Sequence, residues 1–313
     1  MLKTRTFKWS STIFFRCVLG SHDSFSYELS TKKDVAPDVE QTMFGKLAKT
    51  KMMAGMTKKI MHRWSVCQNL SFSEQLKAGV RYFDLRIGFK HKASKVLETE
   101  EHHHKALRFV HGLYGSQVRT GLAEFQHFLE EHPREVVFLH FQHFYNFKED
   151  THKHCINLIT KMFDRKLCPE PKHASDLTLK HMWEKNLQVI VLYKHSSVEQ
   201  EGSLIWNTRQ IENPWGNASS SGDLIKFLRN GTKGVERKDK KFHVSQAVVT
   251  PNQSMIMKHC TSSLKECCAK KAYKDIDKWL QSLSPNEHGR NIFMADFVEM
   301  GDFIQNVLRL NKA

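Results

Sequence analysis

Residues 80–87 read VRYFDLRI, a β-rich apolar run that carries an aspartate and an arginine, Asp84 and Arg86. Side chains two positions apart on a strand point to the same face, so one strand would present both charges together. Similar runs recur along the chain and alternate with amphipathic segments such as 122–131 and 151–163, where apolar residues recur three or four apart. This alternation predicts an α/β fold with a mostly parallel sheet.

The number of predicted strands favours a barrel. The runs are residues 13–19, 80–87, 107–111, 136–141, 187–193, 243–249 and 291–297, with a weaker one at 204–206. A chain of 313 residues with this many strands fits a closed (β/α) barrel of about 250 residues plus extensions. An open doubly wound sheet is the alternative, but no GxGxxG follows the first strand to support it.

The chain shows no internal repeat and no linker rich in Pro, Gly or Ser. We therefore expect residues 1–17 to be an N-terminal segment and 18–313 to form a single domain. The polar stretches 90–105, 199–222 and 232–241 are predicted loops. The first of them contains His102-His103-His104; three adjacent histidines do not share one face, which favours a solvated loop over a metal site.

Composition limits the possible partners. The chain has 48 Lys and Arg against 33 Asp and Glu, a formal net charge of +15, so an acidic partner is expected, either nucleic acid or an anionic membrane surface. No apolar run approaches the roughly 18 residues of a spanning helix, and Arg16 interrupts the only run that resembles a secretory signal. The seven cysteines lack a regular spacing, which predicts reduced, intracellular thiols. We expect a cytoplasmic protein that is monomeric and that binds membranes peripherally.

The polar residues with chemical potential lie at the ends of predicted strands. They are His22, Asp23, Asp84, Arg86, His111 and Asp296. Taken singly, a histidine at a strand end is more often a structural hydrogen-bonding group, and an aspartate after a strand usually caps a helix. In a barrel of parallel strands, however, the strand ends converge on one face, so these side chains are predicted to meet.

Two histidines with carboxylate partners and one arginine suit the cleavage of a phosphodiester. A neutral imidazole can take a proton from an attacking hydroxyl, an imidazolium can give one to the leaving oxygen, and an arginine can offset charge on the phosphoryl oxygens. No metal is then required. Asp84 could hold the Arg86 guanidinium toward the phosphate, or the two could form a buried ion pair that closes the barrel.

The segments GSHDSFSYEL, QNLSFSEQLKAGVRYFDLRIG, FVHGLYG, EHPREVVFLHFQHFYNF and NIFMADFVEMGDFI resemble the phosphatidylinositol-specific phospholipase C X-domain proteins. The resemblance is greatest to the animal branch that consists of the X domain alone, and it runs in order from about residue 18 to residue 310. It implies a distorted TIM barrel and the hydrolysis of phosphatidylinositol to diacylglycerol and an inositol cyclic phosphate.

The same resemblance implies a role for each strand-end residue. His22 would be the general base on the inositol 2-hydroxyl, oriented by Asp296, and His111 would be the general acid, paired with Asp23. Arg86 would contact the phosphate, with Asp84 in support. Calcium is not expected, because the calcium-dependent relatives carry a carboxylate where this chain has Arg86.

Further candidates lie on the substrate side of the predicted site. His140 and Gln142 stand where close relatives carry Asp and Asn, and Lys194 and Trp215 are additional possible contacts to phosphatidylinositol in an anionic membrane. Two other functions stay open: a membrane-binding barrel without turnover, and nucleic-acid binding, although no recognised module accompanies the basic charge. A glycerophosphodiesterase would need a Glu-x-Asp pair, and Asp84-x-Arg86 provides one carboxylate.

Overall fold

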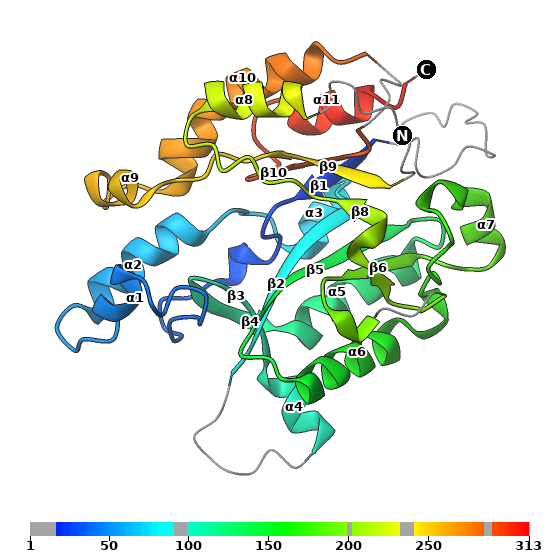
Figure 1. Ribbon diagram of the computed structural model, residues 1–313, viewed down its shortest axis with the longest axis horizontal. Helices are drawn as coiled ribbons and strands as arrows, with labels where there is room; N and C mark the ends of the chain where they lie inside the picture. The colour runs from blue at the N-terminus through cyan, green and yellow to red at the C-terminus, as the bar shows by residue number, and fades with distance from the viewer. Residues whose placement is uncertain (1–16, 91–98, 199–201, 232–240, 285–289, 313) are drawn as a thin grey trace.

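The computed structural model describes residues 17–90, 99–198, 202–231, 241–284 and 290–312. A curled sheet lies at the centre, with helices around it (Figure 1). The strands are β1 (Val18–Ser21), β2 (Tyr82–Phe89), β3 (Leu107–His111), β4 (Leu113–Gln117), β5 (Val137–Tyr145), β6 (Val189–Tyr193), β7 (Trp206–Asn207), β8 (Ile211–Glu212), β9 (Phe242–Ala247) and β10 (Ile292–Ala295).

The sheet is a distorted barrel. Hydrogen-bonded neighbours follow the order β7-β6-β5-β2-β1-β10-β9-β8, and every pair along this path is parallel. The two end strands, β7 and β8, are consecutive in the chain and are joined by the 3₁₀ turn Thr208–Gln210. The ring is thus completed along the chain rather than by a strand ladder, which confirms the predicted distorted TIM barrel.

The predicted strand at 107–111 exists, but its direction differs from that of its neighbours. β3 pairs antiparallel with β2 and forms an antiparallel hairpin with β4, off the barrel path. The prediction that every strand end reaches the site in parallel was therefore wrong for His111. Phe109 is opposite Ile87, so β3 runs back toward the barrel and delivers His111 near the level of Arg86.

The helices cover the sheet on its outer side (Figure 1). They are α1 (Met43–Leu47), α2 (Ala54–Ser65), α3 (Phe72–Ala78), α4 (Glu100–Ala106), α5 (Val118–Glu131), α6 (Glu149–Phe163), α7 (Leu179–Glu184), α8 (Ser221–Asn230), α9 (Gln253–Lys258), α10 (Lys270–Gln281) and α11 (Phe303–Arg309). Helices α8, α10 and α11 lie on the β9–β10 side, while α1, α2 and α9 gather at one end of the molecule.

The helix before β2 shows how local sequence sets an element. Ser71 and Glu74 form a capping box that starts α3, and Gly79 ends the helix in a left-handed conformation with φ of 101°. The chain can then turn directly into β2. Alternation along that strand places Tyr82 in one apolar cluster and Phe83 in another.

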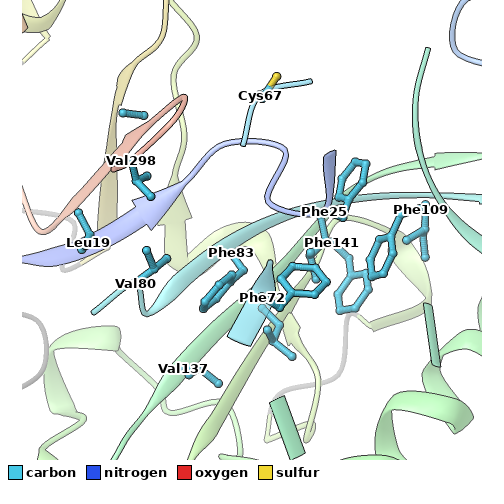
Figure 2. Packing of buried hydrophobic residues seen from close by; sticks show 14 of the residues in the cluster. Leu19, Phe25, Cys67, Phe72, Val80, Phe83, Phe109, Val137, Phe141 and Val298 are labelled. Carbon is cyan, nitrogen blue, oxygen red and sulfur yellow. The ribbon is translucent and has the colours of Figure 1, made fainter. Parts of the chain in front are cut away.

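These two apolar clusters are the interior and the exterior packing layer of the barrel. Phe138 on β5 contacts Phe242 on β9 with ring centroids 5.1 Å apart, although those strands are not neighbours, so their cluster lies inside the barrel. The outer cluster packs strands against helices, and Phe72 of α3 lies 6.0 Å from Phe83 of β2 (Figure 2). Burial of both faces explains the nearly continuous apolar runs in the sequence.

Several sequence predictions need correction or fall outside the described residues. The histidines 102–104 belong to α4 rather than to a loop, because Thr99 caps the helix and the His103 ring stacks on His154 of α6 at 3.9 Å. The predicted strand 13–19 and loop 232–241 lie largely outside the described residues, and β1 covers only Val18–Ser21 of that region. The weak strand predicted at 204–206 corresponds to β7, which covers Trp206–Asn207.

Two short strands, β4 and β8, were not predicted.

The seven cysteines are all free thiols. None of the described helices is long and apolar enough to cross a bilayer.

Candidate active site

A cavity of about 560 Å³ opens where the barrel strands end. One wall is polar and is formed by His22, Asp84, Arg86, His111, Gln142, His143, Lys194, Asn213, Gln246 and Asp296. The opposite wall is mainly apolar and comes from α1, α2, α9 and the segments beside them: Val39, Phe44, Ile60, Met61, Trp64, Val248, Val249, Ile256 and Leu264. The cavity can therefore hold a molecule with one charged end and one apolar end.

The polar wall is the continuation of the barrel interior. Tyr82 faces inward, and the next inward positions on the same strand are Asp84 and Arg86. Met294 on β10 is likewise followed by Asp296. Because strand side chains alternate between faces, the strands that fill the barrel with apolar side chains end by presenting charged ones into the cavity.

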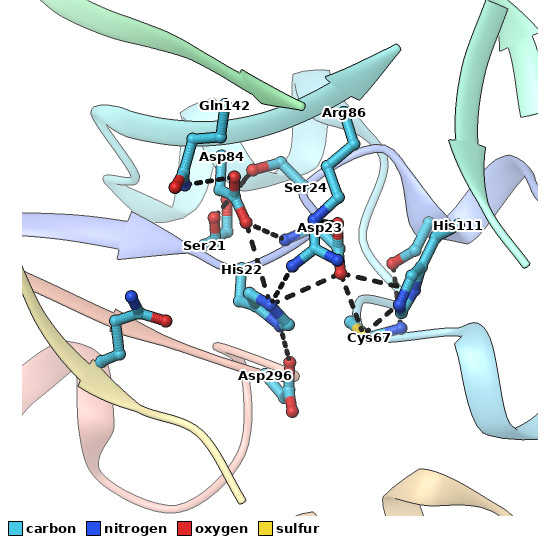
Figure 3. Close-up of polar contacts among 12 residues, drawn as sticks. Ser21, His22, Asp23, Ser24, Cys67, Asp84, Arg86, His111, Gln142 and Asp296 are labelled. Carbon is cyan, nitrogen blue, oxygen red and sulfur yellow. Dashed lines mark hydrogen bonds and ion pairs between the residues drawn. The ribbon is translucent and has the colours of Figure 1, made fainter. Parts of the chain in front are cut away.

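His22 is held from two sides (Figure 3). Its Nδ1 lies 2.7 Å from Asp296 Oδ1, and its Nε2 lies 3.0 Å from Arg86 Nη2. Because a guanidinium can only donate, Nε2 is the acceptor in this arrangement and Nδ1–H donates to the carboxylate. The site therefore selects one tautomer of the neutral ring.

Burial alone would lower the pKa of His22, but the carboxylates of Asp23 and Asp296 outweigh that effect and raise the pKa to about 9. A proton taken up on Nε2 would face Asp23 Oδ2 at 3.4 Å in place of the Arg86 contact. The surrounding carboxylates thus make His22 a stronger base than a free imidazole.

Asp23 lies at the centre of the cluster and is fully buried. Its carboxylate is 2.8 Å from Arg86 Nε, 3.4 Å from His22 Nε2 and 3.3 Å from His111 Nδ1. The residue has a left-handed φ of 39°, which is uncommon outside glycine and turns a side chain that follows His22 back toward the same site. Burial would raise the pKa of Asp23, but Arg86 and the two histidines lower it below its usual value.

Asp84 supports Arg86 through Asp23 rather than by a direct ion pair. The ion pair that holds Arg86 is made by Asp23, whereas Asp84 accepts hydrogen bonds from the backbone N–H of Asp23 at 3.1 Å and from Gln142 Nε2 at 2.5 Å. Although Asp84 and Arg86 share a strand face, the left-handed turn brings Asp23 nearer to the guanidinium. Asp84 consequently fixes Asp23, and Asp23 fixes Arg86.

His111 reaches the site from the β3–β4 hairpin. Its Nδ1 lies 2.8 Å from the backbone oxygen of Ser65, which can only accept, so Nδ1 carries the hydrogen of the neutral ring and Nε2 carries the lone pair. The rings of His22 and His111 are 6.5 Å apart between centroids and nearly perpendicular, at 76°. Both rings contact Asp23, as predicted for one of them.

The predicted substrate-side residues divide into two groups. Gln142, Lys194 and Trp215 line the cavity, and Trp215 is 59% exposed. His140 is not among the lining residues: it is buried one step below the cavity and contacts the Tyr82 hydroxyl at 2.7 Å through Nδ1. Burial and the nearby Lys194 lower the pKa of His140 to about 3, so this ring stays neutral.

The apolar wall was not predicted, nor were several polar lining residues, among them Cys67, His143, Asn213 and Gln246. His143 enters because the register between β2 and β5 shifts at Leu85 and Arg86, so that both Gln142 and His143 border the cavity. Asn213 donates to Gln142 Oε1 at 2.7 Å and accepts from Gln246 at 2.7 Å, which continues the chain of amides from Asp84. A bulge leaves no signature in an isolated sequence.

His22, Asp23 and Cys67 form the one group of potential metal ligands among the described residues, with ligand atoms within 4.8 Å of one another. Arg86 contacts both His22 and Asp23 in the same cluster. Its guanidinium already places a positive charge there, and burial raises the pKa of the Cys67 thiol well above its usual value. This donor set is consequently a poor match for a resident divalent ion.

Comparison with characterised sequences finds relatives over most of the chain. No family model matches it. The mouse protein named PI-PLC X domain-containing protein 3 is 37% identical over 292 residues, which are 93% of this chain and 86% of that protein. The human proteins named PI-PLC X domain-containing protein 2 and 1 are 42% and 31% identical, over 79% and 97% of this chain and 75% and 89% of those proteins.

Solved structures share the fold at low sequence identity. The phosphatidylinositol-specific phospholipase C from Listeria monocytogenes superposes with a TM-score of 0.66 at 16% identity and covers 98% of this chain and 97% of its own. A phosphatidylinositol-specific phospholipase C from Staphylococcus aureus gives a TM-score of 0.65 at 13% identity and covers 98% and 96%. These likenesses establish the barrel architecture.

Proposed function

The chain belongs to the PI-PLC X domain-containing proteins, and we propose that it is a phosphoric diester hydrolase that cleaves phosphatidylinositol by general acid–base catalysis. The observation that carries the proposal is the pair of histidines whose rings lie 6.5 Å apart, share Asp23 and flank Arg86. This pairing provides a proton acceptor, a proton donor and a cation around one point of the cavity.

In the first half of the reaction, His22 Nε2 takes the proton of the inositol 2-hydroxyl while that oxygen bonds to phosphorus. Arg86 Nη2 donates a hydrogen bond to His22 Nε2 at 3.0 Å. When substrate binds, the guanidinium would move to a phosphoryl oxygen and leave His22 Nε2 available for the proton. The Asp23–Arg86 ion pair at 2.8 Å anchors the guanidinium during that exchange. Asp296 at 2.7 Å stabilises the imidazolium that forms.

In the second half, His111 acts as an imidazolium and gives the Nε2 proton to the diacylglycerol oxygen as the bond from phosphorus to that oxygen breaks. Its Nδ1–H stays on the Ser65 carbonyl, and Asp23 Oδ2 lies 3.3 Å from the same nitrogen. The products are diacylglycerol and inositol 1,2-cyclic phosphate. Water can open the cyclic product if the two histidines exchange roles.

The rest of the cavity supports an amphipathic substrate. Gln142 and Lys194 offer polar groups to the inositol ring, Trp215 an aromatic surface at the rim, and His140 supports the floor through Tyr82. The apolar wall faces the site of the lipid moiety. Nearby surfaces carry exposed methionines, among them Met52 at 90% and Met56 at 58%, and the net charge of +15 favours an anionic membrane.

We also propose that the reaction needs no calcium, because the Arg86 guanidinium supplies the positive charge that a metal would bring to the phosphoryl oxygens. Burial would lower the pKa of Arg86, but Asp23 and Asp84 raise it, so the group stays charged at every working pH.

The test is cleavage of phosphatidylinositol vesicles by the purified full chain in excess EDTA, followed by ³¹P NMR, which separates cyclic from acyclic inositol phosphate. We expect the cyclic product, with no increase in rate when calcium is added. Vesicles of phosphatidylserine at equal charge control for the headgroup. Failure to release inositol phosphate with or without calcium would overturn the hydrolase, and activity that EDTA abolishes would overturn the metal-free mechanism alone.

A further inference from the structure

Gln68 lies in the segment that joins α2 to α3 and is completely buried. It is not among the residues that line the cavity. The segment crosses the ends of β1 and β10: the backbone N–H groups of Cys67 and Gln68 donate to Ser26 Oγ at 2.9 and 3.0 Å, and the Cys67 oxygen accepts from the Phe297 N–H at 2.7 Å. Gln68 is therefore held on a rigid backbone behind the site.

The side-chain amide of Gln68 forms hydrogen bonds through both its nitrogen and its oxygen to backbone groups beside His22 and Asp296. Nε2 donates to the backbone oxygen of His22 at 3.0 Å and to that of Ala295 at 2.9 Å, while Oε1 accepts from the Val298 N–H at 3.2 Å. Ala295 and Val298 flank Asp296 on its two sides. One side chain thus hydrogen-bonds the backbone of His22 and the backbone on both sides of Asp296.

The strand ladder does not extend to this pair. The last register pair between β1 and β10 is Ser21 with Ala295, so His22 and Asp296 both lie just beyond it. Phe297 has a left-handed φ of 47°, which turns the chain away from β10 immediately after Asp296. Beyond the ladder, the His22 N–H to Ala295 oxygen bond at 3.1 Å and the Gln68 contacts hold the two backbones together.

We infer that Gln68 is a positioning residue that sets the separation between His22 and Asp296 and so keeps the imidazole aligned for proton transfer. The inference concerns the histidine–carboxylate pair itself and extends the proposed function to a residue outside the cavity. A misplacement of about 1 Å at a reacting group can lower a rate by about a hundredfold, so a buried amide behind the site can matter as much as a lining residue.

Four charged side chains surround the His22 ring. They are Asp296 at 2.7 Å, Asp23 at 3.4 Å, Asp84 at 3.8 Å and the Arg86 guanidinium at 3.0 Å. Asp296 is the nearest carboxylate. Asp23 and Asp296 both raise the pKa of His22. If Gln68 holds Asp296 in place, loss of the amide lowers this pKa, because one of the two contacts that raise it becomes longer.

The experiment compares Gln68→Met with Gln75→Met in the full chain. Gln75 is equally buried and its Nε2 also donates to two backbone oxygens, those of Ser24 at 2.8 Å and Leu70 at 2.7 Å, but it does not touch His22 or β10. Both variants remove a buried amide of the same size. The readouts are the His22 pKa by NMR titration of the imidazole nitrogens, and the kcat and KM for phosphatidylinositol.

We expect Gln68→Met to lower the pKa of His22 by about one unit and kcat by about ten- to a hundredfold with KM nearly unchanged. Gln75→Met should lower the Tm by a similar amount and leave that pKa in place. An unchanged pKa in Gln68→Met, or an equal shift in both variants, would overturn the inference. Because NMR needs no turnover, this result is independent of whether the chain hydrolyses phosphatidylinositol.

If Gln68→Met does not fold, Gln68→Asn provides the second variant. It keeps an uncharged amide but is one methylene shorter, so it cannot reach the His22 and Ala295 oxygens and the Val298 N–H together. The same loss of His22 pKa is expected, and a wild-type pKa in that variant would equally contradict the positioning role.

Discussion

The two histidines of the site are held in different ways. His22 lies on the β1–β10 side, where a carboxylate at 2.7 Å and a guanidinium at 3.0 Å contact its two nitrogens. His111 lies on the β3–β4 hairpin, where a backbone oxygen at 2.8 Å fixes its tautomer and a carboxylate stands at 3.3 Å. The side chain of His22 is 12% exposed and that of His111 is 22% exposed.

This difference separates the control of charge from the control of orientation. Ionised groups around His22 raise its pKa to about 9, whereas the main contact of His111 is with a neutral carbonyl that orients the ring. Asp23 joins the two halves, since it touches both rings and Arg86. Substitutions of the charged groups around His22 should thus move the limb of the pH profile that belongs to His22, and loss of the Ser65 contact should lower the rate because the His111 ring is less well oriented.

The largest effect is expected from removing either ring. His22→Ala or His111→Ala should lower kcat for phosphatidylinositol by about two to four powers of ten, the usual contribution of a general base or acid. His127→Ala is the matched control, because His127 is 74% exposed and contacts only the exposed Glu131 among the ion pairs found. Activity that survives both site substitutions would contradict the two-histidine mechanism, and wild-type Tm values would show that the variants fold.

A smaller effect is expected for Asp296→Asn, which keeps the shape of the side chain and removes its charge. His22 changes its protonation state near pH 9, so one limb of the wild-type kcat/KM profile should lie there. The variant loses a carboxylate that raises the pKa of His22, so this limb should move to lower pH by about one unit. Its maximal rate should fall by about ten- to a hundredfold because the ring is less well oriented.

The pH profile tests the environment assigned to His22. The limb near pH 9 belongs to His22 whether this residue takes or gives the proton, because exchanging base and acid leaves the shape of the profile unchanged. Measurement of kcat/KM in phosphatidylinositol vesicles from pH 5 to pH 10 locates this limb, and a wild-type profile with no limb near pH 9 would contradict the assigned environment.

The smallest effect is expected for Cys67→Ser. The thiol lies 3.9 Å from both Asp23 Oδ2 and His111 Nδ1, and burial raises its pKa so that it stays uncharged. Replacing it with a hydroxyl changes no charge near either ring, so kcat should change by no more than about threefold and the pH profile should keep its position. A shift in the profile as large as that of Asp296→Asn would remove the distinction between the two halves of the site.

Part of the site could be predicted because polar residues at the ends of barrel strands converge on one face. His22, Arg86 and Asp296 were found because each lies at or near the end of an apolar run and inward positions converge in a barrel. The pattern pairs Asp84 with Arg86, because two residues on one strand share a face. The direct ion pair of Arg86 with Asp23 depends on the left-handed turn at Asp23, which is a property of the folded backbone. His143 escaped detection for a similar reason, since a register shift moves it to the cavity.

His140 was predicted to lie at the substrate but does not line the cavity. In the sequence it lies two positions before Gln142 on one strand and looks equally close to the substrate. In the barrel those two positions differ by one layer, so His140 contacts Tyr82 below the cavity while Gln142 lines it. Depth along the barrel axis depends on how neighbouring strands are staggered, and a strand read alone contains no information about that stagger.

The sequence by itself determined the α/β class and the strands that carry the two histidines and the arginine, because periodicity and strand-end residues are local properties. Only the tertiary structure decided that His111 arrives on an antiparallel strand, that Asp23 rather than Asp84 holds Arg86, and that Gln68 grips the backbones of His22 and Asp296. Each of these depends on strand register, on a left-handed residue or on a contact between segments far apart in the chain. Such features arise only when the strands pair.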